Sequence, residues 1–228
     1  MGWQSDKLTR RAFLKLALAG VTISLPVLTR CTQTCSMESL NIIPRAGWGA
    51  VEPIVDASIE GLYDPVVNPG GWLVYDRPLP QVLNTIIVHH SALPFSDGPF
   101  KIQSKHIQYK GFADIAYNFV VDAAGQIYEG RTLTARGAHT GGHNTGTIGV
   151  VLLGNFEEIE ATEAQLMALK RLVGCLASAY TVTHLAGHRD FQPGVTVCPG
   201  ENLEPLLPDL AAELQLEFGT GGYVEPQP

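Results

Sequence analysis

The sequence predicts one mixed α/β (α+β) domain, with a central mixed β-sheet of about five strands flanked by helices. Two observations carry this prediction. Short β-branched runs recur along the chain, and amphipathic stretches long enough for helices separate several of them. The chain has 228 residues, of which 45% are hydrophobic, and this is enough to bury one sizeable core. The net charge is −7 and no basic face stands out, so nucleic acid is not an expected partner.

The first 36 residues differ from the rest. Basic residues precede an apolar run from Leu14 to Leu28, a layout typical of an export signal and too short for a confident membrane span. The stretch Thr9–Lys15, TRRAFLK, resembles the twin-arginine signal. Residues 1–36 are therefore predicted to be a twin-arginine-type export signal or an N-terminal anchor. The mature protein is then expected in the periplasm, the cell envelope or outside the cell. Cys31 could carry a lipid or pair with Cys35 in an oxidising compartment.

The regular core is predicted to begin after a Pro/Gly-rich stretch, residues 52–83, which is interpreted as a long ordered loop. The β-branched run Thr85–His89 is typical of a buried strand. Pro99–Tyr109 is predicted to be a helix, because its apolar residues loosely follow a helical period. Tyr117–Asp122 and Gln126–Glu129 are predicted to pair as a hairpin around the turn Ala-Ala-Gly.

The second half of the core alternates strand and helix. Thr147–Leu153 is an apolar strand, and the capping-box sequence that follows at Thr162 opens a helix predicted to end near Tyr180. Thr181–Ala186 is a short strand and Asn202–Phe218 a final helix. These elements place one domain over about residues 38–218. Residues 219–228 lack a core-forming pattern and are predicted to be a disordered tail.

Histidines occur where two of the predicted strands end. His89 closes the run Thr85–His89, and His188 follows the strand Thr181–Ala186. Sites in α/β sheets tend to form at such ends. Cys198 lies on a Gly/Pro-rich loop that can fold back toward His188, and it could be a disulfide half, a buried thiol, a nucleophile or a metal ligand. Two imidazoles and one thiolate suit zinc and leave a fourth tetrahedral position for water.

Five blocks of the sequence resemble the zinc-dependent N-acetylmuramoyl-L-alanine amidase (type 2) and peptidoglycan recognition protein family. They are IIPRAGWGA (42–50), IIVHHSA (86–92), DIAYNFVVDAAGQIYEGR (114–131), GAHTGGHNTGTIGVVLLGNF (137–156) and AGHRDFQPGVTVCPG (186–200). The blocks stand in the order that the family has and extend over nearly the whole chain after residue 36.

The resemblance implies a role for each matching residue. His89, His188 and Cys198 correspond to the ligands of one Zn²⁺ ion. Tyr117 corresponds to the catalytic tyrosine. Thr196 stands where recognition proteins also have Thr and the phage enzyme has Lys, and it is expected to be a second catalytic residue that contributes a polar contact to the reacting group. The residues expected to contact substrate are His139, Thr140, Asn144 and Arg131, the last through a stem-peptide carboxylate.

Three functions compete. The resemblance favours a monomeric zinc amidase that cleaves the bond between N-acetylmuramic acid and L-alanine in peptidoglycan. The alternative is a recognition module that binds peptidoglycan without cutting it. Such modules commonly lack the cysteine ligand, whereas this chain has Cys198. A hydrolase with Cys198 as nucleophile beside His188 is the third possibility, but it leaves His89 without a role.

Overall fold

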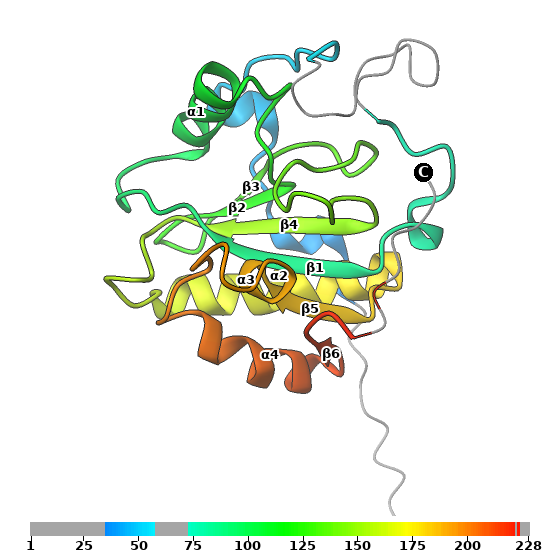
Figure 1. Ribbon diagram of the computed structural model, residues 1–228, viewed down its shortest axis with the longest axis vertical. Coiled ribbons are helices and arrows are strands. Elements are labelled where there is room, and N and C mark those ends of the chain that lie inside the picture. The colour runs from blue at the N-terminus through cyan, green and yellow to red at the C-terminus, as the bar shows by residue number, and fades with distance from the viewer. Residues whose placement is uncertain (1–34, 58–72, 222, 224–228) are drawn as a thin grey trace, which may run out of the picture. The chain divides into compact units, whose positions relative to one another are not determined.

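The computed structural model describes residues 35–57, 73–221 and 223. All but the last two residues of the predicted export signal lie outside this part of the chain. The described residues form one mixed sheet in the order β3-β2-β4-β1-β5-β6, as Figure 1 shows. Its strands are β1 (Thr85–His90), β2 (Phe119–Val121), β3 (Ile127–Glu129), β4 (Thr147–Leu152), β5 (His184–Gly187) and β6 (Glu217–Phe218).

Four α-helices accompany the sheet in the described chain. They are α1 (Pro99–Lys110), α2 (Glu163–Tyr180), α3 (His188–Phe191) and α4 (Leu207–Leu214). Short 3-10 helices cover Met37–Leu40, Arg45–Trp48, Leu79–Gln81 and Glu204–Leu206. The capping box at the start of α2 is present, because the Thr162 hydroxyl accepts from the Gln165 amide and the Gln165 side chain accepts from the Thr162 amide. The mixed fold class predicted from the sequence is confirmed.

The two faces of the sheet bury different clusters. Ile86, Val88 and the alternate residues of the neighbouring strands pack in the larger cluster with the buried leucines of α2. The opposite face holds a smaller cluster around Val120 and Val151 that includes Ile102 of α1. Because side chains alternate along a strand, His89 lies on the α1 face and His90 on the α2 face.

The C-terminal part of the chain differs from its prediction. The helix expected over Asn202–Phe218 ends at Leu214, because Gln215 takes a left-handed conformation, with a φ of 60°, and reverses the chain. The chain then pairs β6 with β5 as a sixth strand. Of the predicted tail, residues 219–221 and 223 are described, and the rest of it lies outside the described residues. Gly219 donates to the Leu185 carbonyl, and the Tyr223 hydroxyl donates to the Thr145 carbonyl.

A disulfide joins Cys35 to Cys175 of α2. This pairing corrects the alternative in which Cys35 pairs with Cys31. The two cysteines are 140 residues apart, so sequence spacing gives no hint of the pair. The bond connects the Met37–Leu40 turn to α2. Leu40 is buried in the larger of the two clusters, together with the leucines of α2.

Within the described part of the chain, every helix is too short or too polar to cross a membrane.

Loss of the disulfide should lower the free energy of unfolding. It closes a long loop in the unfolded chain, and removing such a bond typically costs about 2–5 kcal/mol. We expect Cys35→Ser to unfold at a lower urea concentration than the oxidised wild type. Wild type in strong reductant is the matched control and should unfold where Cys35→Ser does. Equal midpoints for the oxidised wild type and Cys35→Ser would contradict the pairing.

Candidate metal centre

The parallel pairing of β1 with β5 places two histidines side by side. Val88 stands opposite Gly187 in the register, so the next residues, His89 and His188, are neighbours across the sheet. Paired strands lie about 4.8 Å apart, and the two imidazole centroids are 4.6 Å apart. His188 is the first residue of α3 and directly follows the end of β5, so it lies where the chain leaves the sheet.

Cys198 completes the group from a loop. The chain folds back after α3, and the Arg189 amide donates to the Cys198 carbonyl over 2.8 Å. The Cys198 Sγ lies 3.4 Å from the His90 amide, which donates to it, and 3.6 Å from the His89 Nδ1. One donor atom from each of His89, His188 and Cys198 lies within 4.8 Å of the other two. The three side chains predicted to be metal ligands therefore meet at one point.

Burial keeps these groups uncharged in the absence of a cation. His89 is fully buried, and burial, followed by the neighbouring histidines, lowers its pKa well below the usual value. Burial also lowers the pKa of His188. The Cys198 thiol is 7% exposed, and burial raises its pKa to about 12 although the His90 amide favours the thiolate. Without a counter-charge, this site would hold two neutral imidazoles and a thiol.

The donor set fits a zinc ion. Zinc takes neutral imidazole and thiolate ligands, and a nearby dication offsets the cost of a buried thiolate. Ligand atoms about 2.0–2.3 Å from one tetrahedral zinc lie roughly 3.3–3.8 Å apart, and the His89 Nδ1 to Cys198 Sγ distance of 3.6 Å falls in that range. Only three protein donors converge within the described residues, which corresponds to a site with one open position.

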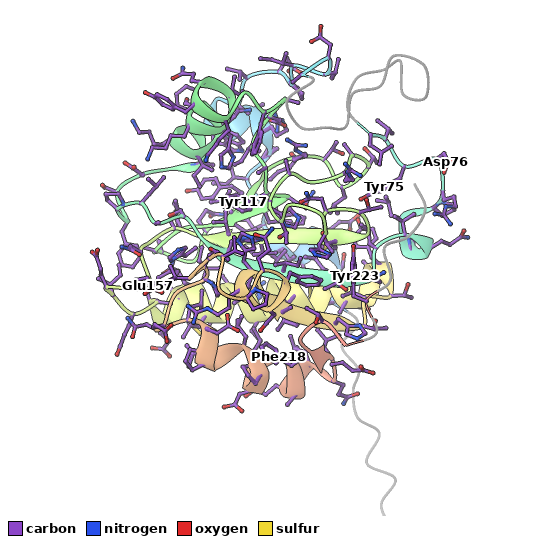
Figure 2. The ribbon with its side chains drawn as sticks, viewed as in Figure 1. Tyr75, Asp76, Tyr117, Glu157, Phe218 and Tyr223 are labelled. Carbon is purple, nitrogen blue, oxygen red and sulfur yellow. A yellow bond between two sulfur atoms is a disulfide. The ribbon has the colours of Figure 1, made fainter. Side chains whose placement is uncertain are left out.

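Tyr117 lies directly beside the metal-ligand cluster. Its ring centroid is 4.9 Å from that of His89 and 5.5 Å from that of His106 on α1, and Figure 2 shows it between α1 and the sheet. Burial, followed by the charge of a Cys198 thiolate, raises the Tyr117 pKa well above its usual value. Its hydroxyl therefore stays protonated near neutral pH and can donate a hydrogen bond.

A cavity of about 430 Å³ opens over this group. Its lining includes His106, Lys110, Phe112, Tyr117, His139, Asn144, His188 and Gln192. The lining combines polar and apolar groups, and Gly137, Ala138 and Gly141 of the Gly-rich loop between β3 and β4 contribute to it. A cavity of this size can hold a small peptide or sugar group against the metal site.

Of the four residues predicted to contact substrate, two line this cavity and two do not. His139 and Asn144 line it. Thr140 is fully buried, and its hydroxyl is hydrogen-bonded to the His139 Nδ1 over 3.0 Å. The Asn144 side-chain oxygen accepts from the amides of His139 and Thr140 at 2.8 Å each. These residues therefore shape the loop, and Asn144 has its amide nitrogen left for a ligand.

His139 is itself mostly buried, at 6% exposure, and contacts a ligand histidine. Its Nδ1 lies 3.1 Å from the His89 Nε2, and burial lowers its pKa to about 3. Two glycines make room for its ring: a Cβ added to Gly137 or Gly149 would lie 2.5 Å from the His139 Cδ2. Glycine inside a strand often marks such a close approach, and Gly149 is in the middle of β4.

Thr196 and His90 each form one hydrogen bond with Cys198. Thr196 bonds the Cys198 backbone amide, and the His90 backbone amide donates to the Cys198 Sγ. The Thr196 hydroxyl accepts from the Cys198 amide over 3.1 Å, so it holds the turn that presents the thiol, and it lies outside the lining of the 430 Å³ cavity. His90 points to the α2 face, as alternation along the strand predicts, and its Nδ1 accepts from the Phe156 amide.

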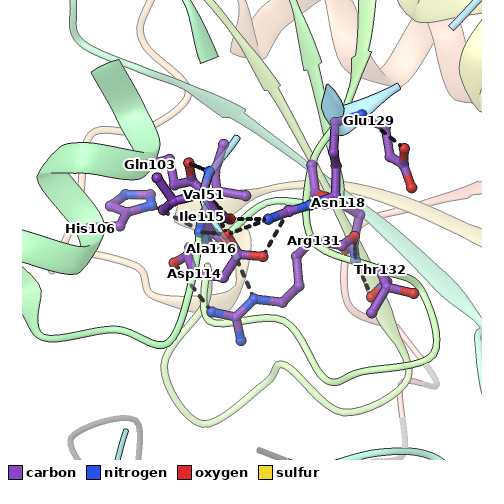
Figure 3. Close-up of polar contacts among 12 residues, drawn as sticks. Val51, Gln103, His106, Asp114, Ile115, Ala116, Asn118, Glu129, Arg131 and Thr132 are labelled. Atoms are coloured by element: carbon purple, nitrogen blue, oxygen red, sulfur yellow. Dashed lines mark hydrogen bonds and ion pairs between the residues drawn. The ribbon is translucent and has the colours of Figure 1, made fainter. Parts of the chain in front are cut away.

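Arg131 is not in the metal-site cavity. It is 1% exposed and donates to the carbonyls of Ile115 and Arg136 at 2.9 and 3.0 Å and to that of Asp114 at 3.4 Å. Figure 3 shows its side chain reaching the backbone of the segment that leads to Tyr117. The prediction that Arg131 binds a substrate carboxylate is therefore not supported: the guanidinium is directed into the protein, where it supports that segment.

An ion pair between Arg45 and Asp114 holds the same segment from the N-terminal side. The Asp114 carboxylate is fully buried and accepts two hydrogen bonds from Arg45, at 2.8 and 3.2 Å, and one from Gln103 of α1. Arg45 belongs to the first of the five sequence blocks. That block does not line the cavity, but it helps to position the segment that leads to Tyr117 through Asp114.

Sequence reasoning missed Gln192. It lies four residues after His188, and its Oε1 is 2.9 Å from the His188 Nε2. Residues four apart on a helix lie on the same face, so the spacing was a usable signal. The Gly/Pro-rich composition of the surrounding stretch suggested a plain loop and concealed the short helix α3.

Comparisons with known proteins show which family and fold the chain is similar to. The profile of a family described as N-acetylmuramoyl-L-alanine amidase matches residues 79–201. Peptidoglycan-recognition protein SC2 of Drosophila melanogaster is 36% identical over 138 residues, which cover 55% of this chain and 72% of that protein. The solved structure of the endolysin N-acetylmuramoyl-L-alanine amidase LysCS from Clostridium intestinale is similar with a TM-score of 0.53 and 34% identity, covering 59% of this chain and 85% of that chain. Human PGRP-IBETAC in complex with glycosamyl muramyl pentapeptide gives a TM-score of 0.59 and 26% identity, covering 74% and 94%.

Arg131→Leu should destabilise the fold. It would leave buried carbonyls without their donor, and each unsatisfied buried group costs about 1–3 kcal/mol. We expect a clear drop in the urea midpoint, while Arg77→Leu, at an exposed position, serves as the matched control with little change. A stable Arg131→Leu protein that binds muramyl peptide poorly would instead support the direct substrate role.

Proposed function

The chain belongs to the N-acetylmuramoyl-L-alanine amidase family, and from that premise we propose that it is a zinc-dependent amidase of peptidoglycan. The bond cleaved joins the lactyl group of N-acetylmuramic acid to L-alanine. The observation that carries the proposal is the complete donor set, His89, His188 and Cys198, of which His188 lines the cavity of about 430 Å³. A solved relative that holds a muramyl peptide supports the substrate class.

The three ligand residues have the protonation chemistry that zinc needs. The lowered pKa values of His89 and His188 keep both imidazoles neutral near pH 7. Cys198 would bind as the thiolate and release its proton on metal binding. When bound, zinc would supply Lewis acidity toward the scissile carbonyl and lower the pKa of a coordinated water to roughly 7.

Tyr117 is placed to stabilise charge on the substrate. Its raised pKa makes it a donor and a poor general base. A preformed O–H donor in a buried site favours the carbonyl oxygen as negative charge develops there. Its ring packs near both His89 and His106, and Tyr117 lines the cavity. The cavity walls would orient the muramyl peptide so that its amide lies between Tyr117 and the metal ligands.

The competing proposal is a recognition module that binds peptidoglycan without cleaving it. The relatives include proteins named for recognition as well as for amidase activity. The donor set favours the enzyme, because buried thiol and imidazole ligands with an open position are more than a binding groove requires.

We also propose that the protein acts outside the cytoplasm. The Cys35–Cys175 disulfide supports this, since disulfides persist in oxidising compartments such as the periplasm. The basic, apolar N-terminal sequence is in keeping with it.

Metal removal should abolish hydrolysis. The measurement is release of stem peptides from purified sacculi by the wild type, with and without a tight zinc chelator, and by Cys198→Ser. We expect each treatment to reduce the rate by at least about 100-fold. The chelator removes the metal, and Cys198→Ser removes the thiolate that would hold it. Cys35→Ser is the matched cysteine control and should stay active. Hydrolysis that persists in chelator would exclude the zinc mechanism, whereas binding without hydrolysis by the zinc-loaded wild type would favour the recognition module.

Tyr117→Phe should separate catalysis from metal binding. Removing one donor to a developing oxyanion typically lowers kcat by about 10²–10³-fold. We expect that loss with an unchanged zinc content, measured by elemental analysis of the purified protein. A variant that loses its zinc would show that Tyr117 supports the metal site instead.

A further inference from the structure

Gln192 lies between the metal-ligand cluster and the Gly-rich loop. It follows α3 directly, and its side chain spans two partners. Its Oε1 is 2.9 Å from the His188 Nε2, and its Nε2 is 3.0 Å from the Gly141 carbonyl oxygen. Gln192 and His188 both line the cavity.

The two hydrogen bonds together determine which nitrogen of His188 carries a proton. The Gly141 carbonyl can only accept, so the Gln192 amide nitrogen must face it. The amide oxygen then faces His188 and can only accept in turn. The His188 Nε2 must therefore be the N–H donor, and the Nδ1 is left with its lone pair.

His89 has the same arrangement with a different partner. The Cys198 Sγ lies beside its Nδ1, and its Nε2 lies 3.1 Å from the His139 Nδ1. Each ligand histidine thus has its Nε2 engaged by a second residue, which leaves its Nδ1 as the nitrogen available to a metal. Both second residues connect to the Gly-rich loop, since His139 belongs to it and Gln192 donates to Gly141.

We propose that Gln192 is a positioning residue that fixes the tautomer and ring orientation of His188 so that its Nδ1 is presented to the metal. The inference rests on the proposed function, because it takes the bound metal to be zinc. Partners of this kind orient a ligand imidazole before binding, and their loss typically weakens metal affinity by about 10–100-fold. The hydrogen bond from the Gln192 side-chain nitrogen to the Gly141 carbonyl keeps Gln192 itself in place, because it prevents the side-chain amide from rotating.

The test measures metal binding without substrate. The full-length apoprotein is titrated with Zn²⁺ against a chromogenic chelator, and the absorption spectrum of the Co²⁺-loaded protein reports ligand geometry. Gln192→Leu removes the acceptor, and Gln192→Asn, one methylene shorter, is the second variant if the leucine protein does not fold. Gln192→Glu retains an acceptor for the His188 N–H. Gln108→Leu, on the exposed side of α1, is the matched control.

We expect the Kd for Zn²⁺ to rise at least tenfold in Gln192→Leu and Gln192→Asn, with a changed Co²⁺ spectrum. Gln192→Glu keeps the acceptor for His188 but loses the donor to Gly141, so it should bind Zn²⁺ more tightly than the Leu and Asn variants. Gln108→Leu should equal the wild type. Unchanged affinity in the Leu and Asn variants would overturn the inference, as would a Glu variant that binds as poorly as they do.

The same experiment separates this inference from the function on which it rests. A wild type that binds no zinc would overturn both. A wild type whose zinc affinity depends on Gln192 but which hydrolyses no peptidoglycan would support the inference and overturn the amidase. Active wild type with zinc affinity indifferent to Gln192 would overturn the inference alone.

Discussion

The parallel register between β1 and β5 is the constraint on which the candidate site depends. With Val88 opposite Gly187, the two strands deliver His89 and His188 to adjacent positions at one edge of the sheet. A shift of one residue would turn His89 to the α2 face, because side chains alternate along a strand. The apolar packing of α2 against that face opposes such a shift. The hydrophobic core thus fixes the spacing of two candidate metal ligands.

A second layer of polar contacts surrounds the ligand residues, and much of it comes from the Gly-rich loop. His139 reaches His89, Gly141 anchors Gln192, and the Asn144 side chain bonds the loop amides. Two glycines of this region, Gly137 and Gly149, have a steric role, because a side chain at either position would collide with the His139 ring. The loop is therefore both a wall of the cavity and a support of the site beneath it.

Much of the fold could be predicted from the sequence because its signals are local. The β-branched runs, the capping box at Thr162 and the turn before Gln126 depend on near neighbours. The errors arose where distant residues decide the outcome. The final helix ends early because the chain after Gln215 pairs with β5. Cys35 pairs with Cys175 across 140 residues. The charge of Arg131 suggested a substrate contact, but its burial against backbone carbonyls indicates a structural role.

The sequence by itself determined the fold class, the family and the three residues that converge as candidate ligands. These depend on which residues are present and on their order along the chain, and both can be read from motifs and their spacing. Only the tertiary structure decided which nitrogen each histidine presents, that Gln192 and His139 hold the two rings, and which polar residues reach the cavity. The reason is physical: a hydrogen bond depends on distance and direction between atoms, and residues such as His89 and His139 become neighbours only when the sheet and the loop pack together.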